Sequence, residues 1–449
     1  MADTLFQPLR FRNLTIKNRL IRSNVSGRFD NYDGSGTRTR INWETRFARG
    51  GVGAIVSSFV PVHGRGRILP NYAMIDDDNK IPFWREVGKR VHEHDCRFLL
   101  QLSHGGRQRD IAGIEYPDSW SSTSKPDPLH GFEATAMTVQ QINEVVQQFG
   151  QAAERTQRAG LDGVELHGAN GYLITQFLSS AINDRKDDYG GTLERRARFV
   201  LEIVRSIRQR CGRDFHLQMK ISATENNNAM SIGEPRGNTI QDSVQVCQWL
   251  EAEGVDAIHV SGGSFFPHPR NPAGDLPVAD FVRVYDAMIS SGRNTLRNFL
   301  LLKNDVTGKL FRDRWIKERG NVIEGLNLPD AAAIRKAVGI PVICTGGFQT
   351  ASVIRQAIAS GQCDAVSMAR PLIANPDLPR IFEAGAERPP VPCTYCNKCL
   401  INAVENPLGC YDETRYTTRD AMVRDILSVF DPAPFPAVFT ASTEPGRDG

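Results

Sequence analysis

Eight short apolar runs recur along the chain, and they constrain the fold more than any other feature of the sequence. The runs lie at residues 20–25, 54–58, 98–102, 163–166, 216–221, 257–260, 341–344 and 364–368. Amphipathic segments typical of helices separate most of them, as at 144–158, 195–210 and 240–253. Strands that alternate with helices form parallel sheets, and eight such units predict a (β/α)8 TIM barrel, an α/β fold.

Polar residues and glycines follow every one of these runs. In a TIM barrel the carboxyl ends of the strands meet on one face, and active sites form there. These endings therefore predict a single shared site. The residues that we expect at this site, in chain order, are Ser26, Ser58, Gln101, His167, Lys220, Gly263, Gly346, Gly347, Ala369 and Arg370.

The run at 163–166 delivers three polar side chains in quick succession. His167 and Asn170 could donate hydrogen bonds to a single oxygen, which is the arrangement that stabilises a developing oxyanion. Tyr172 is a candidate proton donor beside them. The alternative is a loop whose polar residues only cap the next helix, and this stretch alone does not decide between the two interpretations.

The segment that follows carries a family resemblance. Residues 167–191, HGANGYLITQFLSSAINDRKDDYGG, together with ERRARF at 194–199, resemble the signature block of the old yellow enzyme superfamily of FMN-dependent oxidoreductases. The resemblance extends over residues 1–390. It implies a flavoprotein that takes hydride from NAD(P)H and passes it to an activated alkene, such as an α,β-unsaturated carbonyl compound. In that role His167 and Asn170 would hold the carbonyl oxygen and Tyr172 would donate the proton.

A bound flavin ring needs an amide at its pyrimidine edge and a positive charge near N1 and O2, because that charge stabilises the anionic reduced form. Gln101 is the expected amide and Lys220 the expected cation. Both fall where the old yellow enzymes have Gln and Arg or Lys. By the same resemblance, Ser26 takes the place of a Thr or Cys that tunes the flavin, and Ser58 that of a small residue that contacts it.

The phosphate of FMN needs backbone N–H groups and a cation. Gly346 and Gly347 let the backbone approach closely, and Arg370 follows the last run, where it can pair with a phosphate. Barrels generally hold phosphate in these last two loops. TGGF at 345–348 and ARPLIANPDLP at 369–379 also resemble the family's FMN-phosphate block. No GxGxxG motif follows a predicted strand, so no dinucleotide-binding domain is expected within this sequence. The family resemblance implies instead that NAD(P)H docks transiently over the flavin.

Three regions depart from a minimal barrel. Residues 103–137 are rich in Ser, Pro and Gly and are expected to form a rim segment that covers the site. Residues 265–325 form a long insertion before the seventh strand, with 280–303 expected to be helical and 308–320 to be a solvated basic helix face. We expect the FMN-binding barrel at residues 1–390, and a cysteine-containing segment and tail at 391–449, loosely ordered from residue 431 on.

Four of the nine cysteines cluster near the end of the chain, at Cys393, Cys396, Cys399 and Cys410. In a cytosolic chain this spacing favours metal over disulfide. Larger relatives of the old yellow enzymes, such as 2,4-dienoyl-CoA reductase, carry a four-cysteine iron–sulfur (4Fe–4S) cluster there. They separate the second and third cysteines by three residues, however, and here the gap is two. An iron–sulfur cluster, a structural zinc ion and no metal all stay open.

Composition narrows the classes of function. A net charge of +3 over 449 residues, without a long run dense in Lys and Arg, argues against a nucleic-acid partner. The sequence shows neither an apolar signal segment nor a stretch long enough to span a membrane, so we expect a cytoplasmic protein with a small-molecule substrate. A homo-oligomer and a separate electron-transfer partner are both compatible with the sequence.

The leading hypothesis from the sequence is thus an FMN-dependent, NAD(P)H-dependent ene-reductase. One alternative is a flavin-dependent dehydrogenase or demethylase that exports electrons through an iron–sulfur relay. Another is a barrel that binds flavin without turnover, against which Lys220, Arg370, His167, Asn170 and Tyr172 all count. The sequence identifies neither the physiological substrate nor a preference between NADH and NADPH.

Overall fold

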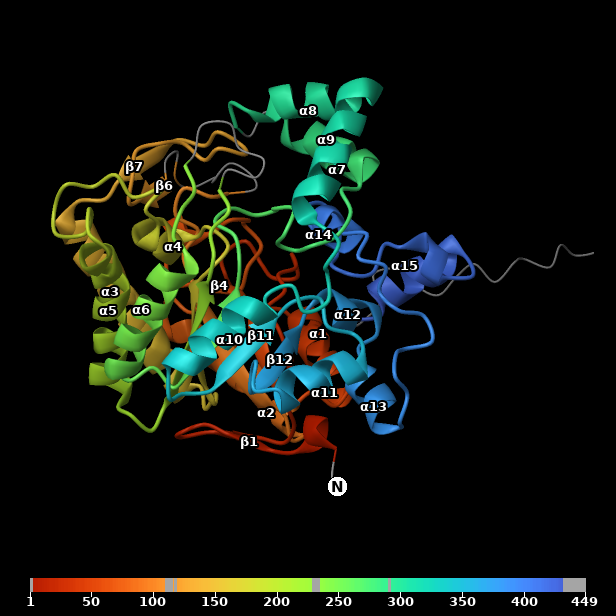
Figure 1. The fold of residues 1–449 in the computed structure, drawn as a ribbon, viewed down its shortest axis with the longest axis horizontal. Helices are drawn as coiled ribbons and strands as arrows, with labels where there is room; N and C mark the ends of the chain where they lie inside the picture. The colour runs from red at the N-terminus through yellow and green to blue at the C-terminus, as the bar shows by residue number, and fades with distance from the viewer. Residues whose placement is uncertain (1–2, 110–115, 117–118, 228–234, 290–291, 431–449) are drawn as a thin grey trace, which may run out of the picture.

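The computed structural model describes residues 3–109, 116, 119–227, 235–289 and 292–430. Eight parallel strands close into a barrel in chain order, which confirms the predicted TIM barrel (Figure 1). The barrel strands are β3 (Leu20–Arg22), β4 (Ala54–Pro61), β5 (Arg97–Ser103), β8 (Gly163–Gly168), β9 (His216–Ser222), β10 (Ala257–Ser261), β11 (Val342–Thr345) and β12 (Ala365–Met368). Each strand overlaps one of the eight apolar runs. The strands are almost entirely buried, because helices cover the outside of the barrel and side chains fill its inside.

Helices form the outer layer of the barrel. They are α1 (Arg38–Arg49), α2 (Ile81–His92), α3 (Val139–Arg158), α5 (Leu193–Cys211), α6 (Ile240–Ala252), α10 (Leu328–Ala337), α11 (Ala351–Ala359), α12 (Arg370–Ala374) and α13 (Leu378–Glu383), with the short α4 (Leu173–Leu178) at the rim. Helix α3 begins at Val139 rather than at 144, because Thr138 and Gln141 form a capping box. The Thr138 hydroxyl accepts the N–H of Gln141, and the Gln141 side chain accepts the N–H of Thr138.

The amino-terminal end of the barrel is closed by a hairpin of β1 (Leu9–Arg10) and β2 (Thr15–Ile16). Leu9, Phe11 and Ile16 pack there in one cluster with Ile21 and Ile343 of the barrel strands. This leaves the opposite, carboxyl end of the strands as the rim on which a site can form. Short 3₁₀ turns lie at Thr4–Phe6, Gly64–Gly66, Asp78–Lys80 and Glu413–Arg415.

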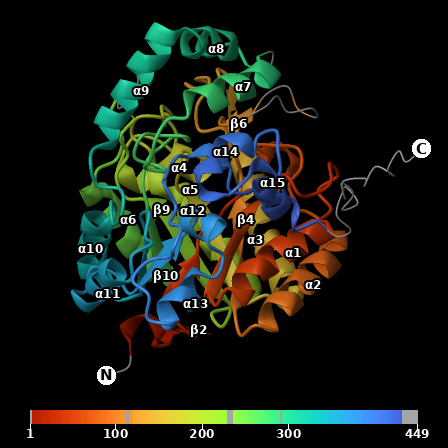
Figure 2. The same cartoon turned by 90° about the vertical axis from the view of Figure 1, so that its right-hand side faces the viewer.

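The insertion before β11 contains three helices, α7 (Val278–Met288), α8 (Thr295–Lys303) and α9 (Asp305–Arg319). The stretch 280–303, predicted as a single helical region, is therefore divided between two helices. Helix α9 contains the predicted basic stretch and begins where the Asn304 side chain accepts the N–H groups of Val306 and Thr307. Figures 1 and 2 show α7, α8 and α9 as an arch that stands out beyond the rim.

The arch contacts two other segments of the chain. Just before α8, the N–H of Asn294 donates to the His130 carbonyl at 2.9 Å, in the rim segment that also holds the short strands β6 (Ser119–Ser121) and β7 (Ala134–Ala136). In α7, Val284 packs against Ile401 in α14 (Lys398–Asn402), which belongs to the cysteine segment. The insertion thus connects the rim segment to the C-terminal part of the chain.

The described part of the C-terminal segment, which also contains α15 (Arg419–Leu427), lies against the barrel. Arg46 of α1 forms an ion pair with Asp425 at 2.7 Å, and the Asn42 amide donates to the Val429 carbonyl at 2.9 Å. The predicted loosely ordered tail from residue 431 on lies outside the described residues. Among the helices of the described residues, none has the length and apolar character needed to cross a membrane.

Candidate active site

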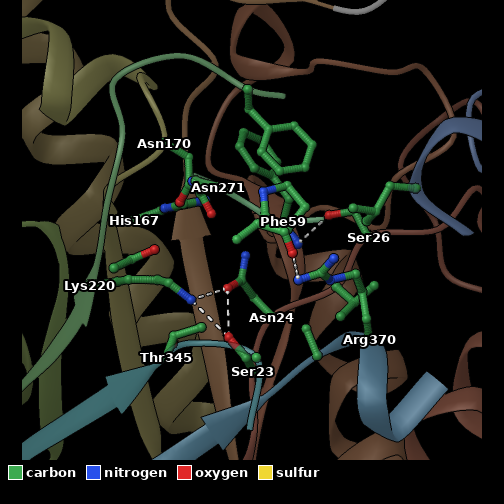
Figure 3. Close-up of a pocket in the computed structure, with 18 of the residues that line it drawn as sticks. Ser23, Asn24, Ser26, Phe59, His167, Asn170, Lys220, Asn271, Thr345 and Arg370 are labelled. Atoms are coloured by element: carbon green, nitrogen blue, oxygen red, sulfur yellow. Dashed lines mark hydrogen bonds between the residues drawn. The ribbon is translucent and has the colours of Figure 1, made fainter. Parts of the chain in front are cut away.

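One pocket at the rim collects most of the predicted site residues (Figure 3). It is lined by Ser26, His167, Asn170, Tyr172, Lys220, Gly346, Gly347, Ala369 and Arg370. These residues come from the ends of five different barrel strands, or from the loops that follow them, and the closed barrel brings them together.

Three predicted site residues do not line this pocket. Ser58 and Gln101 are fully buried beneath it, and the Gln101 Nε2 donates to Glu165 Oε1 at 2.8 Å. The Gln101 Oε1 has no hydrogen-bond partner within the described part of the chain, so it is a buried acceptor still open to a donor. Gly263 lines a neighbouring polar hollow, and its carbonyl accepts the hydroxyl of Ser222.

Lys220 supplies a buried positive charge on one side of the pocket. Its Nζ donates to Ser23 Oγ at 2.9 Å and to Asn24 Oδ1 at 2.5 Å, both at the end of β3 (Figure 3). Burial lowers the pKa of Lys220 to about 8, against the opposing effect of the Glu165 carboxylate. At neutral pH the ammonium is therefore mostly charged, and only neutral oxygens contact it.

His167 is buried and uncharged. Burial and the nearby Lys220 lower the pKa of His167 to about 3, so a neutral imidazole lines the pocket at pH 7. Its ring contacts the rings of Tyr172 and Phe59 edge to face, with centroids 4.8 and 5.8 Å apart, and its Nδ1 has no hydrogen-bond partner among the described residues. His167 can thus act as a hydrogen-bond donor or acceptor without bringing a charge.

The turn after β8 fixes Asn170 next to His167. Asn170 has a positive φ of 65°, and its N–H donates to Ser222 Oγ at 3.1 Å. Gly171 follows at φ 84°, and a Cβ there would lie 2.0 Å from the Ser264 carbonyl oxygen. Only glycine fits this second position, so the turn holds a single conformation.

The predicted end of the second strand at Ser58 is wrong. Strand β4 continues to Pro61, and a bulge between Val56 and Phe59 shifts its register against β5. The bulge brings Phe59 to the pocket, where its backbone N–H donates to Ser26 Oγ at 3.1 Å. Phe59 was missed from the sequence, because one apolar side chain after two serines carries no signal of a bulge.

The other side of the pocket is built around Arg370. Only 6% of Arg370 is exposed; its Nη1 donates to Asn397 Oδ1 at 2.5 Å and its Nη2 to the Ala273 carbonyl at 2.8 Å. No carboxylate lies within 4 Å of this guanidinium in the described part of the chain. A buried cation that contacts only neutral oxygens favours the binding of an anion.

The cysteine segment contributes to this side. Leu400, Ala403 and Val404 line the pocket, and the Tyr395 hydroxyl donates to the Gly347 carbonyl at 2.5 Å. Gly347 has a positive φ of 69°, which glycine adopts freely. The sequence carried no signal for these contacts, because they join residues far apart in the chain.

The four clustered cysteines line one small cavity together with Arg370 and Arg415. Arg415 Nη1 donates to Cys410 Sγ at 3.2 Å, and burial raises the pKa of Cys393, Cys396 and Cys399. The described residues contain no group of three or more His, Cys, Asp or Glu side chains close enough to share a metal ion. The cysteines are gathered, but in this arrangement they do not form a metal site.

A buried polar network beneath the pocket was also missed. Glu165 Oε2 accepts His259 Nδ1–H at 2.6 Å and the Gln218 amide at 2.5 Å, while its Oε1 accepts the bond from Gln101. His259 Nε2 lies 2.7 Å from the hydroxyl oxygen of Thr345, which lines the pocket. Hydrogen bonding and the charges of its neighbours lower the pKa of Glu165 to about 2 against the effect of burial. Glu165 is a charged residue within an otherwise apolar strand, and this was the feature of the sequence from which a buried polar network could have been predicted.

Comparison with known proteins identifies the family. The model of the NADH:flavin oxidoreductase / NADH oxidase family matches residues 4–298. The chain belongs to this family. The predicted old yellow enzyme superfamily is thereby confirmed.

Relatives within the superfamily differ in length and in named activity. The chain is 30% identical to the NADH oxidase of Thermoanaerobacter brockii over 92% of its own length, and 28% identical to the cinnamate reductase of Clostridium sporogenes over 90%. It spans only 58% and 56% of those two proteins. It is also 28% identical to the 4,4'-dithiodibutanoate disulfide reductase of Rhodococcus erythropolis, over 94% of this chain and 96% of that protein.

Solved structures show the same fold. A 2-naphthoyl-CoA reductase superimposes with a TM-score of 0.73 at 22% identity, covering 91% of this chain and 57% of that one. The old yellow enzyme homologue from Zymomonas mobilis superimposes with a TM-score of 0.66, also at 22% identity, covering 93% and 98%. At this identity the likeness concerns the barrel and not the substrate.

The pocket of this family member has the chemistry that FMN requires. Lys220 offers a positive charge beside the space for the ring, and the uncompensated guanidinium of Arg370 offers one for a phosphate. These two cations fit a flavin mononucleotide better than a neutral ligand.

Proposed function

We propose that the protein binds FMN in the rim pocket, takes hydride from NAD(P)H, and delivers it to an activated alkene such as an α,β-unsaturated carbonyl compound. The observation that carries this proposal is the pair of buried cations in one pocket, Lys220 and Arg370, with His167 and Asn170 beside them. When bound, FMN supplies the hydride chemistry, and the protein's own residues orient the reactants.

At the cofactor, each residue has one task. Arg370 and the backbone at Gly347 would hold the phosphate through charge-assisted and N–H hydrogen bonds. Lys220 would hold the ring side of the pocket, where its charge would favour the reduced, anionic flavin. Ser26 and the buried Ser58 shape the opposite edge.

At the substrate, the neutral imidazole of His167 and the amide of Asn170 donate hydrogen bonds to the carbonyl oxygen and polarise the alkene. The absence of charge on His167 matters, because a neutral donor does not compete with Lys220 for the anionic flavin. The Tyr172 hydroxyl then gives its proton to Cα. NAD(P)H docks in the same pocket and leaves before the alkene enters, so turnover is ping-pong.

The test is steady-state reduction of cyclohexenone by NADPH with the FMN-loaded protein. The double variant His167→Ala/Asn170→Ala should lose about 10²–10³-fold or more in kcat, the cost of removing oxyanion donors. His167→Asn keeps an N–H donor and should retain more activity than His167→Ala. An unchanged rate in the double variant would contradict the assignment, and wild-type protein whose flavin is not bleached by NADPH would point to a non-catalytic flavin barrel.

The cysteines support a second, separate candidate. The four side chains line one cavity beside Arg370, and a dehydrogenase or demethylase with an electron relay is the alternative function that such a cluster of thiols suggests. Among the described residues no three of them are positioned to share a metal ion, so neither an iron–sulfur cluster nor zinc has a part in the reaction proposed above. Iron and zinc analysis of anaerobically purified protein distinguishes the alternatives: about four iron atoms per chain supports the relay, and neither metal supports the ene-reductase alone.

We also propose that residues 1–390 form the FMN-binding barrel and that residues 391–449 form an accessory segment. The position of α14 at the pocket supports a role for this segment in ligand binding.

A further inference from the structure

The loop at 393–399, between the first and third clustered cysteines, touches the proposed phosphate site at two points. Asn397 contacts Arg370, and Tyr395 contacts Gly347. We propose that this loop is part of the flavin-phosphate site, and that Asn397 is a positioning residue that holds the Arg370 guanidinium in the orientation that receives a phosphate monoester. The inference rests on the proposed binding of FMN.

Asn397 is itself fixed by the chain around it. Its Nδ2 donates to the Asp275 carbonyl at 2.8 Å, and its backbone carbonyl accepts the N–H of Leu400 at 3.1 Å at the start of α14. It has a positive φ of 62° and is only 4% exposed. With Nδ2 committed as donor, Oδ1 must face Arg370 as acceptor, so the amide has one orientation only.

The chain packs closely around this contact on two sides. A Cβ on Gly274 would lie 2.3 Å from the Tyr395 carbonyl oxygen and 2.8 Å from both Arg370 Nη1 and Asn397 Nδ2. The guanidinium carbon lies 5.3 Å from the centre of the Tyr395 ring. The guanidinium is therefore enclosed on the sides of Gly274 and Tyr395.

This enclosure has a consequence for binding. A free arginine side chain loses much rotamer entropy when it orders around an anion, whereas one already held by neutral acceptors does not. Asn397 leaves the charge of Arg370 uncompensated, so the guanidinium is both ordered and available to an anion. A carboxylate in place of the amide would order the guanidinium equally well but would neutralise it.

The experiment compares FMN with riboflavin, which lacks only the phosphate. Full-length protein is freed of flavin, and both ligands are titrated by quenching of flavin fluorescence. Asn397→Gly removes the side chain while tolerating the positive φ, and should raise the Kd for FMN about tenfold, the usual cost of one lost hydrogen bond to a charged group. The Kd for riboflavin should change less than twofold.

Two further variants sharpen the test. Asn397→Asp places a carboxylate against Arg370. It should raise the Kd for FMN more than Asn397→Gly does, again without changing the Kd for riboflavin. Asn402→Ala removes another buried amide of the same segment, one whose partners include Asp280 and the Lys398 carbonyl, and should leave both affinities unchanged. Circular dichroism of each variant establishes that it is folded.

The outcomes separate this inference from the proposed function. An Asn397→Gly protein that binds FMN as tightly as wild type contradicts the role of Asn397 while leaving FMN binding intact. Equal weakening of FMN and riboflavin also contradicts it, because that indicates a general structural role. Wild-type protein that binds neither flavin contradicts the proposed function itself.

Discussion

The two ends of the pocket hold their cations in different ways. Lys220 is held within the barrel, by Ser23 and Asn24 at the end of β3, the strand that lies across the closed barrel from β9. Arg370 is held from outside the barrel, by Asn397 of the cysteine segment and Ala273 of the insertion. A TIM barrel thus fixes one end of the site by itself and depends on two added segments for the other.

The electrostatic surroundings of the two ends differ as well. Lys220 has a counter-charge in the barrel interior, because Glu165 opposes the lowering of its pKa by burial. Arg370 has no carboxylate within 4 Å in the described part of the chain. The Arg370 end should consequently depend more strongly on a bound anion, and the Lys220 end on pH.

The largest effect is expected at the Arg370 end. Arg370→Met should raise the Kd for FMN more than about a hundredfold, since two or more hydrogen bonds to a charged group are lost at about 1.5–3 kcal/mol each. Riboflavin affinity should change little, because the ring lies at the other end. Parallel fluorescence titrations with the two flavins measure both numbers.

Fold stability is the control for this variant. Asn397 Oδ1 and the Ala273 carbonyl lose their donor, so the melting temperature of the flavin-free protein is measured in parallel, and a general loss of structure should weaken the binding of both flavins alike. If the affinities for FMN and for riboflavin fall by the same factor, the two ends of the pocket do not bind different parts of the cofactor.

A second effect, about a tenfold change in the rate of flavin reduction, is expected at the Lys220 end. It should be the same with bound FMN and with bound riboflavin. Lys220→Met removes the charge beside the ring and should slow flavin reduction by NADPH about tenfold. In the wild type the rate should fall as pH rises through about 8, because the Lys220 ammonium is protonated below its pKa and neutral above it. Lys220→Arg keeps its charge and should show no such fall; stopped-flow reduction between pH 6 and 9.5 compares them.

The same contrast explains how far the sequence could lead. The barrel strands, and His167, Asn170 and Lys220 at their ends, could be predicted because an apolar run and the polar residue after it are neighbours in the chain. The strand order then brings them together without further information. The backbone conformation of the turn after a strand also depends on neighbouring residues in the chain. Gly171 is an example, because its positive φ is one that glycine adopts readily.

Contacts between distant segments could not be predicted in this way. Nothing in the sequence near Asn397 indicates that it contacts Arg370, and nothing near Leu400 indicates that it lines a pocket. The bulge in β4 could not be predicted for a different reason. The hydroxyl oxygen of Ser57 accepts the N–H of Gln101 on the neighbouring strand, so Ser57 and Ser58 continue β4 instead of ending it. Each miss depends on a partner far away in sequence.

A smaller effect is expected from the neutral partners of Lys220. Asn24→Ala removes one acceptor but leaves Ser23 in place, so flavin reduction should slow only about threefold, the typical value of one net hydrogen bond. This is less than the tenfold loss of FMN affinity expected for Asn397→Gly, because Lys220 keeps a second barrel acceptor. A loss of a hundredfold would show that the Lys220 end is as dependent on a single partner as the Arg370 end.

The smallest effect at pH 7 is expected for Glu165→Gln, and it is visible mainly in the pH profile. Glu165 raises the pKa of Lys220, so its neutral replacement should lower that pKa below the wild-type value of about 8. The fall in reduction rate should therefore begin at lower pH, while the rate at pH 7 drops only about twofold. Glu225→Gln is the matched control, since Glu225 is also a buried carboxyl group but bonds to Ser179, outside the network under the pocket. A pH profile that shifts equally in both variants would mean that Lys220 responds to burial in general and not to the counter-charge of Glu165, which would remove the electrostatic difference between the two ends.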